Sequence, residues 1–429
     1  MISENELHFN TSELDDAVFL HVSQNPFYKS VKIDVFLLSE LVYPGHTYTN
    51  LVSRLCERGS RTYPSMRHLN RRFEELFGAC FLSNSVSFAG NSLLHLSLEI
   101  IAAEYCLRFS GLNPFNEASR LLFEVLFQPN LNSNGYPEDV VAHEKKVINS
   151  HLVSVINDKT NYAHRRCVEE TVRGTAWSIL TPGRVVDLEC VDGETIWSFH
   201  QKLISTCPIH IFVNGDVAKS DVSILQESFL RSLPKRRPKK VSKKNAVKSD
   251  SPRKIFEIQP LSQAKYVVSY YTGPILDMNQ HATLLVFDSL WAGDSHGILY
   301  RELREKQGVC YYVDSQLDRF SGVLYTMVGC AHSDFEVVSR SIEQMLCHMR
   351  SEQFLMENLV HSKALIKNRL ISALHDRDSN LRIFLSSIIT DYNIELDGLS
   401  ECVDRVTVGG ISLLAKNLTK GVEYFLHDQ

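Results

Sequence analysis

Residues 303–316, LREKQGVCYYVDSQ, form the most specific local pattern in the chain. Residues 297–307 have the periodicity of a helix that ends at a glycine, and residues 309–313 have the composition of a strand. Arg304 is therefore predicted on the last turns of the helix and Tyr311 on the strand behind it. The turn between these two elements can bring the two side chains together.

The length and composition are those of an ordinary folded protein. A chain of 429 residues, 44% apolar and 22% charged, is expected to form two domains or one domain built of two halves. The formal net charge of -5 gives no general attraction to nucleic acid or to an anionic membrane. The ten cysteines form no CxxC pair, which argues against a zinc ribbon and favours free thiols in a reducing compartment.

Neither secretion nor membrane insertion is indicated. The first twenty residues carry acidic side chains where a signal peptide would need a basic start and an apolar run. No uncharged apolar stretch reaches the length of about 18 residues that could span a bilayer. We therefore predict a cytoplasmic protein.

A basic segment divides the chain. Residues 231–254 contain eleven Lys or Arg, one Asp and three Pro without apolar periodicity, which is typical of a linker. We predict an N-terminal domain at 1–231, the linker at 232–254 and a C-terminal domain at 255–429. A basic run of this kind could bind RNA, but such runs are more often simply solvated.

Helix-like and strand-like patterns occur on both sides of the linker, which predicts two α+β halves. Helical periodicity is found at 63–77, around 121–127, at 138–156 and at 336–350, and strand-like runs at 209–213, 266–271 and 323–328. No repeat between the halves is visible in the residues themselves.

Four further segments accompany residues 303–316, namely CERGSRTYP at 56–64, LFGA at 76–79, NDKTNYA at 157–163 and FVNGDV at 212–217. Together they resemble the insulinase or pitrilysin family of zinc peptidases, in the branch of short two-domain subunits that includes the mitochondrial processing peptidase. In that branch an Arg is followed seven residues later by a Tyr within a run like LREK.GL.Y.V, which Arg304 and Tyr311 match. The resemblance implies two homologous insulinase-like halves, each a mostly antiparallel sheet packed with helices.

Active members of this family carry HxxEH, in which two His bind zinc and the Glu acts as general base. No two of the seventeen His in this chain are four residues apart, so the motif is missing. Alignment of the family's motif on this sequence implies that Asn50 replaces the first His, Ser53 the Glu and Arg54 the second His. An Arg cannot ligate zinc because its guanidinium stays protonated.

A later helix carries the remaining metal-site positions of the family. The segment HEKKVINSH resembles the family's ExxxxxxE helix, which implies that Glu144 matches the supporting Glu and that His151 replaces the Glu ligand. From the residues alone, Glu144 and His151 are better explained as a polar stripe on an amphipathic helix. One His and one Glu also make a poor tetrahedral zinc site.

Arg304 and Tyr311 are the candidate functional pair. An Arg and a Tyr directed into one cleft offer a fixed cation and an O–H donor, which suits a peptide carbonyl as it becomes a tetrahedral oxyanion. The resemblance implies that this pair faces a zinc ion held by a partner chain across a closed chamber. The alternative is that Arg304 pairs with a neighbouring acid such as Glu302 or Asp314 and that Tyr311 fills the core.

We therefore predict a non-catalytic subunit of a heterodimeric zinc peptidase. It would pair with a homologous HxxEH-containing subunit, enclose a short unfolded peptide and contribute Arg304 and Tyr311, in peptide maturation or in general peptide turnover. No cofactor is expected in this chain, because the zinc would belong to the partner. Two alternatives stay open: a metallopeptidase with unusual ligands drawn from Glu144, His151 and a further His such as His95, or a peptide-binding or assembly scaffold that interacts through the basic linker.

Overall fold

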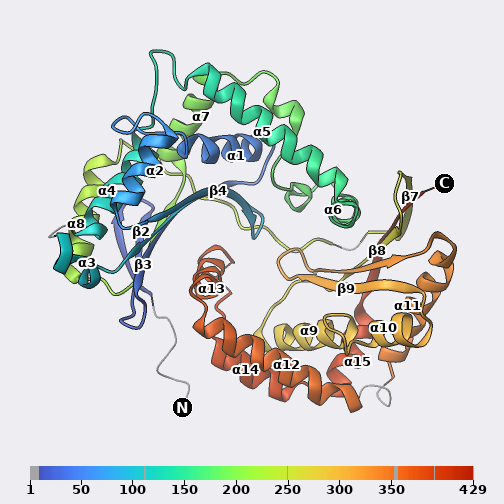
Figure 1. The fold of residues 1–429 in the computed structure, drawn as a ribbon. Coiled ribbons are helices and arrows are strands. Elements are labelled where there is room, and N and C mark those ends of the chain that lie inside the picture. Colours follow the sequence, from blue (N-terminus) through green and yellow to red (C-terminus); the bar gives the residue numbers. More distant parts are fainter. Residues whose placement is uncertain (1–8, 111–112, 249, 352–355, 391, 429) are drawn as a thin grey trace. The chain divides into compact units, whose positions relative to one another are not determined.

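The computed structural model describes residues 9–110, 113–248, 250–351, 356–390 and 392–428 (Figure 1). Residues 1–8, at the start of the acidic N-terminal stretch considered above, lie outside this part. The described chain forms two compact units. The first unit contains residues 9–153 and 179–242, and the second contains residues 154–178 and those from 243 onward.

The first unit is built on a six-stranded sheet in the order β1-β2-β6-β3-β5-β4. Its strands are β1 (Asn10–Asp15), β2 (Val18–Gln24), β3 (Ser30–Glu40), β4 (Cys80–Phe88), β5 (Asn91–Ile101) and β6 (Ile209–Gly215). Neighbouring strands are antiparallel except for β2 and β6, which are parallel.

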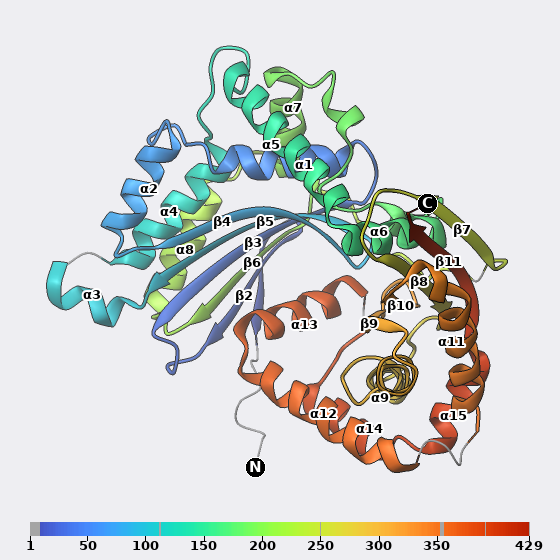
Figure 2. The same ribbon diagram turned by 45° about the vertical axis from the view of Figure 1, so that its right-hand side comes forward.

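Helices of the first unit pack on one face of this sheet, as Figure 2 shows for α1, α5 and α7. They are α1 (Gly45–Cys56), α2 (Met66–Glu75), α3 (Ala103–Ser110), α4 (Pro114–Phe127), α5 (Glu138–Asn157), α7 (Gly193–Thr206) and α8 (Lys219–Ser232), with a 3-10 turn η2 (Val185–Leu188). The core between helices and sheet is apolar, with Leu51 and Leu55 of α1 packed near Leu94 and Leu96 of β5.

The second unit contains a five-stranded sheet in the order β7-β11-β8-β10-β9. The strands are β7 (Arg253–Ile258), β8 (Ala264–Tyr271), β9 (Cys310–Asp318), β10 (Val323–Cys330) and β11 (Thr419–His427). Only β7 and β11 are parallel neighbours.

The α-helices of this unit are α6 (Lys159–Thr171), α9 (Met278–Trp291), α10 (Ile298–Tyr300), α11 (Phe335–Met349), α12 (Met356–His375), α13 (Arg377–Thr390), α14 (Leu396–Arg405) and α15 (Val408–Asn417). The 3-10 turns η1 (Ala176–Ser178) and η4 (His332–Asp334) and a π-helix, η3 (Arg301–Lys306), complete it.

The two sheets share one topology. Leaving out the edge strand β1, the spatial order in each sheet is first, fifth, second, fourth and third strand of its half. In both, the first and fifth strands are parallel and the other pairs antiparallel. The prediction of two mostly antiparallel α+β halves is therefore confirmed, although the repeat is invisible in the sequence.

Helix α6 belongs to the second unit although it precedes β6 in the sequence. All eight residues of β8 are buried, because alternate side chains enter two different cores. Tyr266 and Val268 face a core that includes residues of α9 and α11, whereas Val267 packs with Ala163 and Cys167 of α6. Residues 154–178 thus pack with the C-terminal sheet, although they lie within the segment 1–231 expected to form the N-terminal domain.

Within the described residues, no helix combines the length and the apolar character that a membrane crossing requires.

Tyr312 explains why β10 carries a glycine at position 329. A Cβ atom built on Gly329 would lie 2.2 Å from Cε1 of Tyr312. The ring cannot easily move, because it packs on the core beneath α6 and the Lys265 ammonium lies over it at 5.0 Å.

We therefore expect Gly329→Ala to lower the free energy of unfolding by about 1–3 kcal/mol. Gly410→Ala in α15 is the matched control, because its Cβ would meet its nearest neighbour at 3.5 Å and Ala favours a helix. Denaturant unfolding of both variants measures the difference. An equal effect of the two substitutions would contradict the packing argument.

Candidate functional site

The positions that replace HxxEH lie on α1. Asn50 and Ser53 are buried, and each is committed to the backbone. The Asn50 amide donates to the carbonyl of Pro182 at 2.9 Å, and the Ser53 hydroxyl donates to the carbonyl of Asn50 at 2.8 Å. Neither side chain is arranged as a metal ligand, because Asn50 ties α1 to the loop at Pro182 and Ser53 bonds to the backbone of its own helix.

Arg54 meets Glu144 of α5. Its Nη1 lies 3.7 Å from Glu144 Oε2, while Nη2 of Arg58 contacts Oε1 of the same carboxylate. The Glu144 side chain is 1% exposed, whereas those of Arg54 and Arg58 are 27% and 29% exposed. A carboxylate so deeply buried needs compensating positive charge, and here two guanidinium groups supply it.

Glu57 adds a second carboxylate beside these arginines. Its Oε1 accepts a hydrogen bond from the backbone N–H of Ser83 at 3.0 Å. Burial raises the pKa of Glu57, while Arg54 and Arg58 oppose that shift. The site is therefore a cluster of two arginines and two acids that joins α1 to α5 and β4.

The two histidines considered as ligands do not join this cluster. His151 is exposed and lies seven residues along α5 from Glu144, which is about 10 Å of helix rise. His95 of β5 instead contacts Asp34 through Nε2 at 2.8 Å. Among the residues that the structure describes, no group of three or more His, Cys, Asp or Glu could hold a metal ion. The residues at the positions of the family's zinc site therefore do not fit zinc.

Arg58 was missed in the sequence, although it lies within the CERGSRTYP segment. It follows the last residue of α1 by two positions, close to Arg54 in the last turn. Two basic residues near the C-terminal end of one helix were a signal for an acidic partner. Only the fold could identify that partner, because Glu144 is 86 positions away from Arg58 in the sequence.

Arg304 lies on an irregular helix. The helix predicted at 297–307 is present, but it consists of one α-turn, α10, followed by the π-helix η3, and the chain turns at Gly308 with φ of +66°. π-Helices are rare and occur frequently at functional sites. The Arg304 side chain is exposed, and its guanidinium lies 5.1 Å from the centroid of the Tyr300 ring.

Tyr311 lies at a β-bulge on β9. Gly329 of β10 pairs with Tyr312 and Cys330 pairs with Cys310, so Tyr311 is the extra residue. Bulges are enriched near active sites, where they redirect a side chain. Tyr311 is 54% exposed, while its neighbour Cys310 stays buried in the core.

The geometry can now be compared with known proteins. Residues 191–365 match the family model for the Peptidase M16 inactive domain. A protein of Bacillus subtilis named as a probable inactive metalloprotease, YmfF, is 21% identical over 406 residues, which cover 95% of each chain. Over residues 191–365 the chain is therefore similar to the peptidase M16 inactive domain. The predicted resemblance to non-catalytic insulinase-like proteins is thereby confirmed, and this inactive-metalloprotease homologue has no HxxEH motif.

Solved structures share the fold of this M16 homologue. A conserved protein from Enterococcus faecalis superimposes with a TM-score of 0.90 at 24% identity, covering 98% of this chain and 99% of that one. A peptidase M16 inactive domain from Pseudomonas fluorescens gives a TM-score of 0.75 at 15% identity and covers 99% of both chains. The likeness extends over both units.

This chain is expected to hold no zinc by itself, because the guanidinium groups of Arg54 and Arg58 pair with the Glu144 carboxylate and would repel a metal cation. Elemental analysis of the purified chain should find much less than one zinc per chain, before and after incubation with zinc and desalting. About one tightly held zinc, together with chelator-sensitive peptidase activity, would instead support the alternative of unusual ligands.

Removal of Arg58 should be costly, because it leaves the buried Glu144 carboxylate with Arg54 at 3.7 Å and the exposed His143 ring at 3.9 Å as its remaining basic neighbours. We expect Arg58→Met to lower the free energy of unfolding by roughly 1–3 kcal/mol, less than a fully buried pair would lose because Arg58 is partly exposed. Denaturant unfolding measures the change.

Two further variants sharpen this measurement. Arg71→Met removes an arginine that is 80% exposed and paired with Glu75, so its effect should stay within about 0.5 kcal/mol. Adding Glu144→Gln to Arg58→Met should restore part of the loss, since no unpaired charge then remains buried. Equal effects of Arg58→Met and Arg71→Met would contradict the role of the ion pair.

Proposed function

We propose that this chain is the non-catalytic subunit of a two-chain zinc peptidase, in which it helps to enclose a peptide and contributes Arg304 and Tyr311 to the active site of a homologous HxxEH-containing partner. The observation that carries the proposal is the local geometry of these two residues. Each projects from a break in regular secondary structure, and each is exposed.

The alternative role for Arg304 was an ion pair with Glu302 or Asp314. Glu302 is engaged elsewhere, because its Oε2 pairs with the Lys306 ammonium at 3.0 Å and its Oε1 accepts from the Gln307 amide at 2.9 Å. No carboxylate oxygen of the described residues lies within 4.0 Å of the Arg304 guanidinium. A guanidinium stacked on an aromatic ring and left without a carboxylate keeps its donors available for a ligand.

The alternative role for Tyr311 was filling the core. Its exposed ring contrasts with that of the next residue, Tyr312, which packs on the core beneath α6 and donates to Thr160 Oγ1 at 3.5 Å. Because of the bulge, these adjacent tyrosines differ in environment, with Tyr311 exposed and Tyr312 packed on the core. This contrast supports an external role for the Tyr311 hydroxyl.

The chemistry fits peptide hydrolysis. As water attacks a peptide carbonyl, the oxygen gains negative charge, and a fixed cation with an O–H donor can stabilise that charge. The hydrolytic zinc and the general base must come from elsewhere, because the residues at those positions here are Asn50, Ser53 and Arg54. A partner chain with the intact motif would supply them.

We propose that the partner binds through a large obligate interface, which commonly buries more than about 2,000 Å² in total. Co-expression with an HxxEH-containing homologue encoded in the same genome, followed by sizing chromatography, provides the complex for kinetic work. Two chains that migrate independently at every salt concentration would contradict the proposal.

In that complex, Tyr311→Phe should lower kcat by on the order of 10²–10³ with little change in KM, because the hydroxyl acts on charge that appears only in the transition state. The substitution keeps the ring and deletes one oxygen. Steady-state peptide hydrolysis measures the effect, with zinc content and complex size checked for each preparation.

Tyr312→Phe is the matched control, because it deletes the hydroxyl of the adjacent tyrosine, which is directed at α6. Its kcat should stay near that of the wild type. If the Tyr311→Phe complex forms normally, retains zinc and turns over peptide at the wild-type rate, Tyr311 has no catalytic role and the chain acts as a scaffold.

A further inference from the structure

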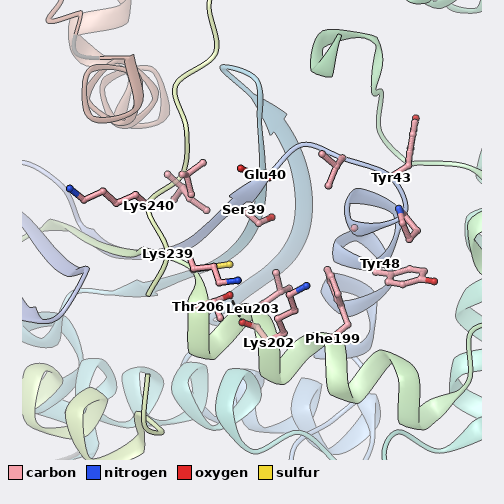
Figure 3. Close-up of a pocket in the computed structure, with 16 residues that line it drawn as sticks. Ser39, Glu40, Tyr43, Tyr48, Phe199, Lys202, Leu203, Thr206, Lys239 and Lys240 are labelled. Carbon is pink, nitrogen blue, oxygen red and sulfur yellow. Dashed lines mark hydrogen bonds between the residues drawn. The ribbon is translucent and has the colours of Figure 1, made fainter. Parts of the chain in front are cut away.

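The first unit contains a cavity of about 560 Å³ that the proposed function does not use (Figure 3). It lies where β3 ends and α1 begins, and it is bounded by α7 and by residues 239–241 of the basic segment. Its volume falls within the usual range for ligand pockets, about 300–1,000 Å³.

The basic segment forms an ordered wall of this cavity. The backbone N–H groups of Arg237 and Lys239 donate to the carbonyls of Ser205 and Thr206, each at 2.8 Å, and Arg236 donates to the carbonyl of Cys207. These carbonyls belong to the C-terminal end of α7, where helical partners are missing and positive charge is favoured. Residues 236–239 are therefore attached to the unit, in contrast to the solvated linker expected from composition.

The opposite side of the cavity is aromatic and preorganised. Tyr48 and Phe199 pack edge to face with ring centroids 5.3 Å apart. The Arg184 guanidinium lies 3.9 Å from the centroid of the Tyr43 ring and so supports it. With Val42 and Leu203, these rings offer a surface for an apolar side chain.

Cations line the same cavity. Lys202, Lys239 and Lys240 contribute to the lining, and Glu40 is the one carboxylate there among the described residues. In Figure 3 the Lys240 side chain extends away from Tyr48 and Phe199, whereas Lys202 and Lys239 lie near Leu203. No carboxylate oxygen in the described part of the chain lies within 4.0 Å of these three ammonium groups, so an anionic ligand would meet unpaired positive charge.

The cavity also exposes a piece of strand edge. The N–H of Leu38 donates to Pro208 at 3.0 Å, but the pairing of β3 with β6 stops at Leu37 and Ile209. Glu40 lies two residues beyond Leu38, so its backbone groups face the same side. Glu40 is paired with Asn91 of β5 on its other side, but the pairing with β6 does not reach it, so a short extended peptide could bond on the β6 side.

We propose that this cavity binds the C-terminus of an extended peptide. The terminal carboxylate would lie between the ammonium groups of Lys202 and Lys239, the last apolar side chain against Tyr48 and Phe199, and the peptide backbone along Glu40. Unpaired cations, an aromatic wall and an open side of β3 occur together in this cavity. This combination favours a peptide over a small inorganic anion, which could not use the aromatic wall. The site lies within one unit and needs neither the catalytic partner nor Arg304.

The test uses the full-length chain and a fluorescently labelled hexapeptide that ends in Leu with a free carboxylate. Fluorescence anisotropy should detect binding, and C-terminal amidation of the same peptide should weaken it by about tenfold or more, because a charge-assisted contact is lost. Lys202→Gln combined with Lys239→Gln should weaken binding of the free-carboxylate peptide to a similar extent. It should leave binding of the amidated peptide almost unchanged.

Lys240→Gln is the matched control, because it removes one lining charge whose side chain extends away from the aromatic wall. It should change affinity by less than about twofold, as an exposed and screened charge does. The single variants Lys202→Gln and Lys239→Gln are compared with Lys240→Gln. If Lys240→Gln weakens binding as much as either of them, general electrostatic attraction explains the binding and the proposal is overturned. Equal affinity of the free and amidated peptides, or of an amidated peptide with an internal Glu, would overturn the assignment to a C-terminus.

Discussion

The carboxylate of Glu144 on α5 is buried, and a charge in that position must be compensated. The resemblance to the insulinase-like family predicts a zinc ion near this position in active members. In this chain, Arg54 on α1 and Arg58, two residues after the end of α1, bring the positive charge. The two guanidinium groups thus link the end of α1 to α5 through Glu144, and neither of them can ligate zinc.

The predicted functional pair, Arg304 and Tyr311, is arranged differently. Arg304 and Tyr311 lie on a π-helix and at a β-bulge, and the residues between them turn at Gly308. The surrounding residues Leu303, Cys310 and Val313 are anchored in the core of the second unit. A rigid core with two local irregularities holds exposed side chains in place without help from a carboxylate. This local arrangement is the main support for the proposal that Arg304 and Tyr311 contact a ligand or partner.

Different parts of the basic segment are attached to different units, which its composition alone does not indicate. Residues 236–239 attach to the C-terminal end of α7 through backbone and guanidinium hydrogen bonds, whereas Val247 further along bonds to Ser321 of the second unit. Between these points, Lys240 and Lys243 are exposed and Lys244 is half-buried. The segment is therefore both a connection in the chain and, in its first part, a wall of the cavity beside α7.

The sequence by itself determined the type of several local elements, such as α5, α11, β8 and β10, and the absence of HxxEH. Helical and strand periodicities depend on neighbouring residues, and the absence of paired His is visible in any linear reading. Only the tertiary structure decided which distant groups meet, such as Glu144 with Arg58, or α6 with the C-terminal sheet. It also decided that residues 301–306 form a π-helix and that Tyr311 is bulged, because those features depend on pairing with β10 and on core packing. Such contacts join positions far apart in the chain, and no local pattern of residues encodes them.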